Sequence, residues 1–536
     1  YEDDTRVRKA RTPNEGYLAL ESGATENRAT WVRFREGDLP EFDFRRTQLL
    51  AWCGSIGTLQ NNWRSDLYPI LDIRWDERRI RLGGAPWWPF TPDNRYFVQG
   101  AIEFLDAPGE YHIDRKDDWL YYIPLQGDVE GHRILAPTTG TLVSLAGSSP
   151  KSPVHHISFE GLSFRFTDFS EEYHGGSAQA HEGALTLVNT QDIAILGCRI
   201  SQVGFNGIAM RDGARSNRIA DCLIEHTGLA GISITTGYDA ILGAGFQTWE
   251  EGWISRDNQV ENNLVQYGGE LGGGEGHGIS LETSGRNRIV GNTIRSMVRS
   301  GISILDTSYG FFKRLGSLFG TPITLENHMD LNYSRNNLIQ GNDISHVLTD
   351  SSDCGAFYSF GGGSGNRIEG NYIHDYAGLP ESIVTGIYLD DSADGFTVRG
   401  NLVARVGGAA PHAHPLVIKG RGNVIEQNVF LDNISSDLFL TMESNLDAYA
   451  GGNAPEQREP TDGIVFRRNV FLETFEAGRG PRVALMYNYK PDTFAVFDDN
   501  LFFIREMPET MYSFYGNGLG IPEWGSYRPF SYAEWH

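Results

Sequence analysis

The chain has 536 residues, of which 40% are hydrophobic and 12% aromatic. This composition suits a folded protein with a large core and excludes an intrinsically disordered chain. The formal net charge of −24 disfavours nucleic acids and anionic membrane surfaces as partners. No apolar run reaches the roughly 18 residues of a transmembrane helix, so we expect no membrane span.

Residues 1–150 differ in character from the rest of the chain. They are rich in Trp and Arg and contain short strand-like runs such as RIRLGG and WLYYIPL. They also lack the repeat that follows them. We therefore predict a separate β-rich, sandwich-like module over 1–150 and a second domain over 151–536.

From about residue 155 one element recurs, in which a β-branched residue is followed shortly by Gly-Asn or Asn-Asn. Clear copies are NRIVGNTI, NRIEGNYI and FTVRGNLV. The repeated Asn stands at 263, 292, 342, 371, 401, 428, 469 and 500. Several gaps are 27 to 31 residues, and the longer ones contain insertions. A repeat of this size without helical periodicity predicts a β-solenoid, here an all-β right-handed parallel β-helix. Asn side chains at one bend of successive coils can hydrogen-bond along the stack.

A second element indicates which side chains face outward. It reads NGIAMR, AGISIT, HGISLE, SGISIL, CGAFYS, TGIYLD and HPLVIK in successive coils. Because strand side chains alternate, the first and third residues after the glycine should face the core, including Ala356 and Tyr358. The fourth position then forms an outward column, with neighbours about 4.8 Å apart. This column consists of Arg211, Thr235, Glu282, Leu305, Ser359, Asp390 and Lys419.

Three insertions interrupt the coils, at about 236–258, 306–335 and 443–462. Loops that project from a rigid solenoid commonly build its binding site. Trp249, Trp253 and Tyr309 are therefore candidates for stacking against sugar rings. The alternative is that these rings only anchor their own loops to the scaffold.

The four cysteines fit neither a disulfide framework nor a zinc motif. Cys198 and Cys222 occupy matching repeat positions, so we expect them to stack in the core, with a disulfide between them as the alternative. Neither HExxH nor paired Cys/His spacing occurs, so we predict no transition-metal site and no cofactor. Calcium near Asp391 or Asp394 remains an alternative, because clustered oxygen ligands suit that ion.

Several motifs resemble those of bacterial β-helix glycoside hydrolases. ARTPNEGY and the stretch from FTPDNRYFVQG to WLYYIPLQGD resemble motifs of these enzymes, as do SSDCGAFYSFGGG, GNYIHDY and GIYLDDSADG. In this order they are most similar to glycoside hydrolase family 141 and more distantly to family 120. The resemblance spans nearly the whole chain, although the chain looks shortened at both ends against the family pattern.

The resemblance implies a pair of catalytic carboxylates. In family 120 the residue that matches Asp390 is the nucleophile, and the acid lies one coil later, where this chain has Lys419. The family 141 pattern implies the pair Asp390 and Asp353. On a straight strand their six-residue offset is roughly 20 Å, so the pair requires that the chain at 351–354 curves over the groove. Asp391 is the alternative, and Glu282, Asp306, Asp375 and Glu381 are weaker ones.

Other residues complete the candidate site. Tyr388 lies beside Asp390 on the outward face of its strand. We expect it to bind substrate together with Glu282, Lys419, His412 and His414. Alternatively, Asp391 and Asp394 cap the DDSADG turn, and the two histidines are ordinary surface groups.

The resemblance favours hydrolysis of a plant cell-wall carbohydrate, either xylan or fucosylated pectin side chains, by two carboxyl groups. A lyase or epimerase that acts on a uronic-acid polymer, with Lys419 or Arg421 at its centre, is one alternative. A non-catalytic glycan-binding solenoid is the other. The resemblance also implies a periplasmic or extracellular location, and no signal peptide precedes Tyr1 in this sequence.

Overall fold

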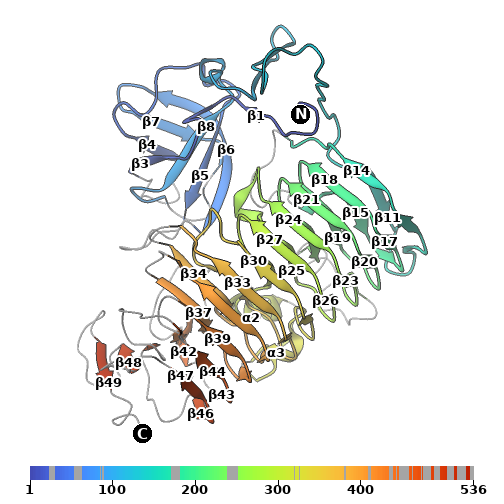
Figure 1. The fold of residues 1–536 in the computed structure, drawn as a ribbon, viewed down its shortest axis with the longest axis vertical. Helices are drawn as coiled ribbons and strands as arrows, with labels where there is room; N and C mark the ends of the chain where they lie inside the picture. Colours follow the sequence, from blue (N-terminus) through green and yellow to red (C-terminus); the bar gives the residue numbers. More distant parts are fainter. Residues whose placement is uncertain are drawn as a thin grey trace.

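The computed structural model shows a long stack of β-coils with a separate N-terminal module beside it (Figure 1). The structure describes residues 1–22, 30–53, 63–84, 86, 90–170, 181–237, 252–318, 320–324, 326–379, 382–408, 412–433, 439–441, 443–445, 458–460, 463–472, 474, 485–487, 495–503, 512–515 and 527–530. Trp249 and most of the insertion at 443–462 lie outside these residues.

Three long sheets run along the stack, and their neighbouring strands come from successive coils. We call the 13-stranded one the groove sheet. In it the pairing is parallel from β11 to β48. The predicted right-handed parallel β-helix is confirmed.

The groove sheet consists of β11 (Val143–Ala146), β15 (Gly183–Val188), β19 (Asn206–Arg211), β22 (Ile232–Thr235), β25 (Ile279–Glu282), β28 (Ile302–Leu305), β31 (Cys354–Phe360), β34 (Ile383–Leu389), β37 (His412–Ile418), β40 (Phe439–Thr441), β45 (Leu485–Tyr487), β48 (Tyr512–Tyr515) and β49 (Tyr527–Phe530). The second sheet consists of β13 (Ser158–Glu160), β17 (Ala194–Leu196), β20 (Arg218–Ala220), β23 (Gln259–Glu261), β26 (Arg288–Val290), β29 (Leu338–Gln340), β32 (Arg367–Glu369), β35 (Thr397–Arg399), β38 (Val424–Glu426), β43 (Ile464–Arg467) and β46 (Ala495–Asp498). The third sheet consists of β14 (Ser163–Arg165), β18 (Arg199–Val203), β21 (Leu223–Thr227), β24 (Leu264–Gly268), β27 (Thr293–Met297), β30 (Asp343–Ser345), β33 (Tyr372–Tyr376), β36 (Leu402–Val406), β39 (Val429–Leu431), β44 (Val470–Leu472) and β47 (Leu501–Phe503). Smaller elements are the strand pairs β12 (Val154–His155) with β16 (Thr190–Gln191) and β41 (Glu443–Asn445) with β42 (Arg458–Pro460), the helices α2 (Tyr309–Leu318) and α3 (His328–Leu331), and the 3-10 turn η3 (Gly273–Glu275).

The inside of the stack is filled by the predicted apolar positions. Ile208 and Met210 of β19 are fully buried, and so are Ile387 and Leu389 of β34. Cys198 and Cys222 are buried free thiols, so the alternative of a disulfide between them is excluded. Each coil covers the apolar face of its neighbour, which is how solenoids are stabilised.

The Asn ladder forms as predicted. In each step the side-chain amide of one Asn donates to the side-chain oxygen of the next, from Asn263 to Asn292 at 2.9 Å and onward to Asn500. A second ladder, which the sequence reasoning missed, runs from Asn217 to Asn366. Both ladders pair turn amides that would otherwise be buried without partners.

One coil departs from the alignment on glycine. β31 pairs Phe357 with Ile302 and Phe360 with Leu305, so Phe357 takes the inward position that we expected for Ala356. Tyr358 consequently faces outward, and Phe360 replaces Ser359 in the outward column. The reason is that this copy of the repeat holds one residue more between its glycine and the outward position.

The N-terminal module is built on a seven-stranded antiparallel sheet of β2 (Arg11–Thr12), β8 (Arg95–Gln99), β3 (Leu18–Ser22), β4 (Trp31–Phe34), β7 (Arg79–Leu82), β6 (Arg64–Arg74) and β5 (Gln48–Cys53). A smaller sheet holds β1 (Arg8–Lys9), β9 (Glu110–Asp114) and β10 (Trp119–Tyr122), and a 3-10 turn η1 covers Ile102–Phe104. We expected a sandwich, but β5 pairs with β8 as well as β6 and closes six strands into a ring. The first strand of the groove sheet is β11, which lies ahead of the expected boundary at 150.

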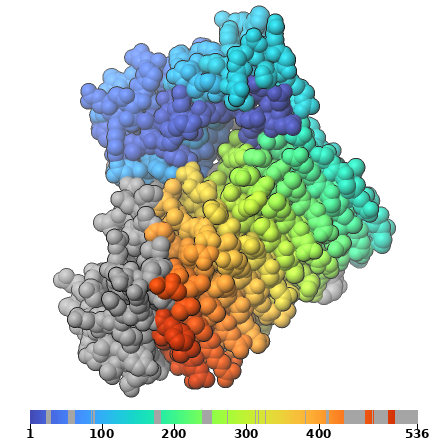
Figure 2. Space-filling view, in the orientation of Figure 1, coloured from blue at the N-terminus to red at the C-terminus, as the bar shows by residue number. Residues whose placement is uncertain are grey.

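The module packs directly onto the coils drawn in green and yellow (Figure 2). Trp52 and Phe97 of the module form one buried cluster with Phe205 and Leu229 of the coils. Both coil residues lie at the bend that leads from the third sheet into the groove sheet. The module therefore stands along one edge of the groove sheet.

Candidate functional site

Asp390 follows β34 directly and lies on the outer side of the groove sheet. Its side chain is largely buried, with 10% of it exposed. Lys419, one coil later, places Nζ 2.6 Å from Oδ1, and the Tyr358 hydroxyl donates to Oδ2 at 2.9 Å. Both oxygens thus meet groups that stabilise negative charge.

Lys419 is held as a cation at this point. Burial by itself lowers the pKa of an ammonium group, but the carboxylates of Asp390, Asp391 and Asp353 more than offset this, and the pKa of Lys419 is raised. Its Nζ also lies 5.1 Å from the ring centre of Tyr388, within range of a cation–π contact.

Asp353 is brought to the same place by a turn of the backbone. Its φ of 50° is in the left-handed region, and its amide N–H donates to the carbonyl of Ile383 at 3.0 Å. The Tyr388 hydroxyl donates to its Oδ1 at 3.3 Å. Burial raises the pKa of Asp353, Lys419 lowers it, and the charge of Asp390 raises it again, with a net rise. The backbone at 351–354 therefore places the carboxyl of Asp353 beside Tyr388 and within electrostatic range of Lys419 and Asp390.

Two tyrosines from neighbouring coils bond to the carboxyl groups. The rings of Tyr358 and Tyr388 meet edge to face, with centres 5.4 Å apart. Tyr358 donates to Asp390 and Tyr388 to Asp353. The guanidinium of Arg299 lies 5.8 Å from the ring centre of Tyr358. The sequence reasoning missed Tyr358 because its alignment turned that ring inward, and it gave no signal for Arg299.

Asp391 and Asp394, which follow Asp390 in the turn, have different surroundings. Asp391 is half-buried, and its charge helps raise the pKa of Lys419. Asp394 is buried, and it accepts hydrogen bonds from His328 Nε2 at 2.8 Å and from the amide of Arg421 at 2.6 Å. Asp394 therefore ties α3 to the coils. Among the described residues, the one group of three side chains spaced for a metal ion is Glu2, Asp3 and His132, in the N-terminal part of the chain.

Glu282 lies in the outward column three coils before Asp390. Its side chain is half-buried, and burial together with Glu275 and Asp306 raises its pKa to about 7, although Arg64 lowers it. Burial also raises the pKa of Asp306 to about 6, against hydrogen bonds from Ser334 and Thr307. By strand spacing Glu282 is about 14 Å from Asp390, so the two do not form a direct pair.

Those predicted sugar-binding rings and histidines that the structure describes have different surroundings. Tyr309 is buried, its amide donates to Ser392 Oγ at 3.1 Å, and its ring packs against His328, so it anchors its own helix. Trp253 is half-buried beside Gly213, near the end of β19. His412 and His414 belong to β37 and pair with Ile383 and Thr385. His414 is half-buried, and the side chain of His412 lies outside the described part.

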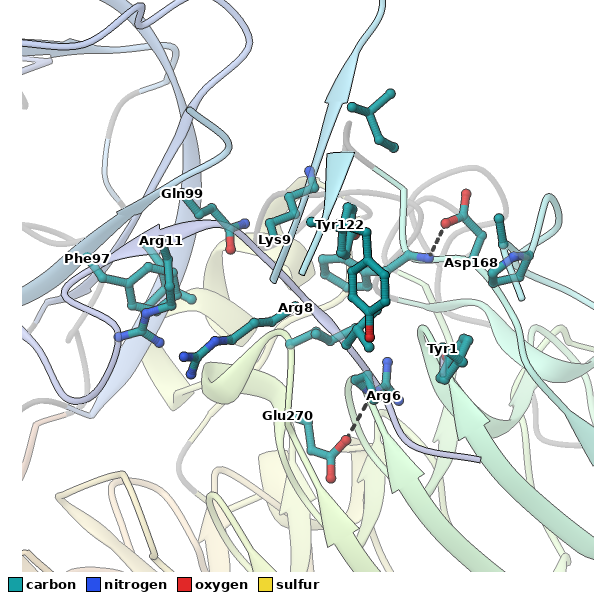
Figure 3. Close-up of a pocket in the computed structure, with 18 of the residues that line it drawn as sticks. Tyr1, Arg6, Arg8, Lys9, Arg11, Phe97, Gln99, Tyr122, Asp168 and Glu270 are labelled. Carbon is teal, nitrogen blue, oxygen red and sulfur yellow. Dashed lines mark hydrogen bonds and ion pairs between the residues drawn. The ribbon is translucent and has the colours of Figure 1, made fainter. Parts of the chain in front are cut away.

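A cavity of about 590 Å³ lies between the module and the coils (Figure 3). Its lining includes Arg6, Tyr17 and Asp350, but neither Asp353 nor Asp390. Arg6 reaches across to Glu270 of the coils at 3.0 Å.

Asp350 connects this cavity with the carboxylate site. It accepts hydrogen bonds from Tyr17 and, at 2.5 Å, from Arg95 of the module. Only two residues separate Asp350 from Asp353. The module therefore fixes one end of the segment that presents Asp353.

A sequence profile described as "Right handed beta helix region" matches residues 164–314. No curated protein matches the chain by sequence. A solved structure named "Glycoside hydrolase" is 18% identical with a TM-score of 0.57, covering 80% of this chain and 76% of that one.

More distant structural similarities were also found. The structure of XylC with xylose is 10% identical with a TM-score of 0.34, covering 95% of this chain and 76% of that one. The A-module of the mannuronan C-5 epimerase AlgE4 of Azotobacter vinelandii is 12% identical with a TM-score of 0.31, covering 68% of this chain and 89% of that one. Together with the profile match and the glycoside hydrolase structure, the coils define this chain as a right-handed parallel β-helix protein. Of the helices that the structure describes, none has the length and apolar character needed to cross a membrane.

Proposed function

We propose that the protein is a glycoside hydrolase whose carboxyl pair is Asp353 and Asp390. The observation that carries this is the contrast between the two groups. Asp390 accepts hydrogen bonds from a cation and a hydroxyl, whereas burial and a neighbouring negative charge raise the pKa of Asp353. Two carboxyl groups in unlike surroundings are what acid-assisted glycoside hydrolysis requires.

In this proposal the carboxyl of Asp353 is the acid and protonates the leaving oxygen of the glycosidic bond. The ionised Asp390 acts on the other side of that bond, as nucleophile or as the base that activates water. Tyr388 holds Asp353 and Tyr358 holds Asp390, so both carboxyl groups are positioned before substrate arrives. Asp391 acts from the edge of the site by adding negative charge beside Lys419.

The lyase alternative is less well supported at this site. A lysine that removes a proton must first be neutral, but Lys419 bonds to Asp390 and its pKa is raised. The site therefore favours hydrolysis over β-elimination. The resemblance to families 141 and 120 adds the substrate class, xylan or fucosylated pectin side chains, and a periplasmic or extracellular location.

The test is Asp390→Asn, assayed by release of reducing sugar from xylan and from pectin side-chain oligosaccharides. We expect a loss of activity of about a thousandfold or more, with a melting temperature only a few degrees lower. The matched control is Asp330→Asn, which changes an exposed carboxyl of α3. Release of unsaturated uronides, seen as ultraviolet absorbance, or full activity of Asp390→Asn would contradict the proposal.

Asp353→Asn distinguishes the two roles. If Asp353 is the acid, this variant loses activity on natural glycosides but keeps much of it on aryl glycosides, whose leaving groups need no proton. Equal losses on both substrates would remove Asp353 from the role of acid.

A further inference from the structure

Within the groove sheet, the outward column continues from Asp390 toward earlier coils. Its side chains are first apolar and then acidic. Phe360 and Leu305 come first, both half-buried and apolar. Glu282 at the end of β25 follows, three strand spacings or about 14 Å from Asp390. An apolar stretch thus separates two places where carboxyl groups face the outside.

Among the described residues, no hydrogen-bond donor and no cation bonds to the carboxyl oxygens of Glu282. In contrast, Asp306 beside it accepts N–H donors of Ser334 at 3.0 Å and Thr307 at 2.9 Å. A half-buried polar group without a partner is costly, so it is expected mainly where a ligand or water completes its bonds.

We infer that Glu282 forms a distal subsite, which binds hydroxyl groups of a glycan chain that lies along the solenoid axis and is cleaved at Asp390. This inference rests on the proposed function and extends it. It implies a substrate of several sugar units, whose apolar ring faces pass over Phe360 and Leu305. A short glycoside would fill the space at Asp390 and leave Glu282 without contact.

The surroundings of Glu282 give the subsite a dependence on pH. The charged groups that face it are Glu275 of η3, Asp306 after β28 and Arg64 of β6, and its pKa is raised to about 7. Below that pH the carboxyl carries a proton, so it can donate to one hydroxyl and accept from another. Above pH 7 the carboxyl of Glu282 loses this proton and can no longer donate a hydrogen bond. Its negative charge then lies near the carboxyl groups of Glu275 and Asp306.

The experiment measures binding in the inactive Asp390→Asn background by calorimetry. The probes are xylohexaose and xylobiose in one arm and long and short pectin side-chain oligosaccharides in the other. For whichever type of glycan the Asp390→Asn protein binds, adding Glu282→Ala should weaken binding of the long probe about tenfold. The affinity for the short probe of that type should not change. Glu282→Gln should keep the affinity and abolish its decline above pH 7, because an amide both donates and accepts without titrating.

The outcomes separate the two proposals. If the wild type hydrolyses neither glycan but Glu282→Ala still weakens binding of the long probe, the proposed function fails and the subsite stands. Equal affinity with and without Glu282→Ala, or no binding in either arm, overturns the subsite. A circular dichroism melt of each variant shows whether a loss of affinity is a loss of fold.

Discussion

Replacing Lys419 with methionine would leave the carboxylate of Asp390 without its cation. Nζ lies 2.6 Å from Oδ1, and the two side chains are 24% and 10% exposed. Removing one partner of a buried ion pair typically costs about 3–5 kcal/mol, because the remaining charge has no counter-ion. Since Lys419 is partly accessible, we expect the lower end, about 3 kcal/mol in the free energy of unfolding.

The assay is a double-mutant cycle of Lys419→Met and Asp390→Asn, measured by urea unfolding at neutral pH. The double variant should recover most of the loss, because asparagine needs no cation. We expect a coupling free energy of about 2 kcal/mol. Arg405→Met is the control, because its pair with Asp375 is 43% and 39% exposed and should contribute less than about 1 kcal/mol. Additivity of the two changes within about 0.5 kcal/mol would refute the pairing.

Three further predictions concern the ladder, the module and the distal carboxyl. Asn371→Ala removes bonds to Ile339 and to two neighbouring Asn side chains, so we expect a loss of about 2 kcal/mol in urea unfolding; an unchanged midpoint would contradict the ladder's role. Arg95→Gln weakens the hold on Asp350 and should lower kcat about tenfold with little effect on KM, while Arg35→Gln, a surface change, should not. The pKa of Glu282 is raised from 4.5 to about 7. The protonated carboxyl therefore contributes its full stability below pH 4.5, and this contribution is lost as the pH rises through 7. Glu282→Gln should reduce the fall in the free energy of unfolding between pH 5 and 8.

The repeat made the coils predictable from the sequence. Asn292, Asn342 and Asn371 recur at the same bend, and each needs the next one to satisfy its amide, so periodicity alone indicated the ladder. The same reasoning placed Asp390 and Lys419 on the outer face, because strand alternation follows directly from the backbone.

Single-residue irregularities limited the prediction of the site. One additional residue in the copy at 354–360 turned Tyr358 outward and put Phe360 where Ser359 was expected. A sequence aligned on its glycines does not show such a shift, since the pattern of apolar residues stays plausible in both registers. Asp353 presented the same difficulty, because its position depends on a left-handed backbone conformation at a non-glycine residue.

The rings of the insertions illustrate a third limit. An aromatic residue in a loop is equally consistent with binding sugar and with anchoring the loop. Tyr309 is buried against His328, and its amide bonds to Ser392, so its contacts are with the scaffold. The sequence shows that an aromatic ring is present in the loop. Only the tertiary packing shows whether that ring binds a ligand or anchors the loop.

Lys419 determines where the acid of the proposed mechanism must come from. In the family 120 pattern that position holds an acid, but here a cation occupies it and bonds to Asp390. In the proposed mechanism the acid then comes from a neighbouring coil as Asp353, whose left-handed backbone conformation lies just before β31. Asp350, three residues earlier in the chain, is held by Tyr17 and Arg95 of the module. In the proposed mechanism the N-terminal module therefore helps to position the acid, so the coils without the module should bind glycan more readily than they cleave it.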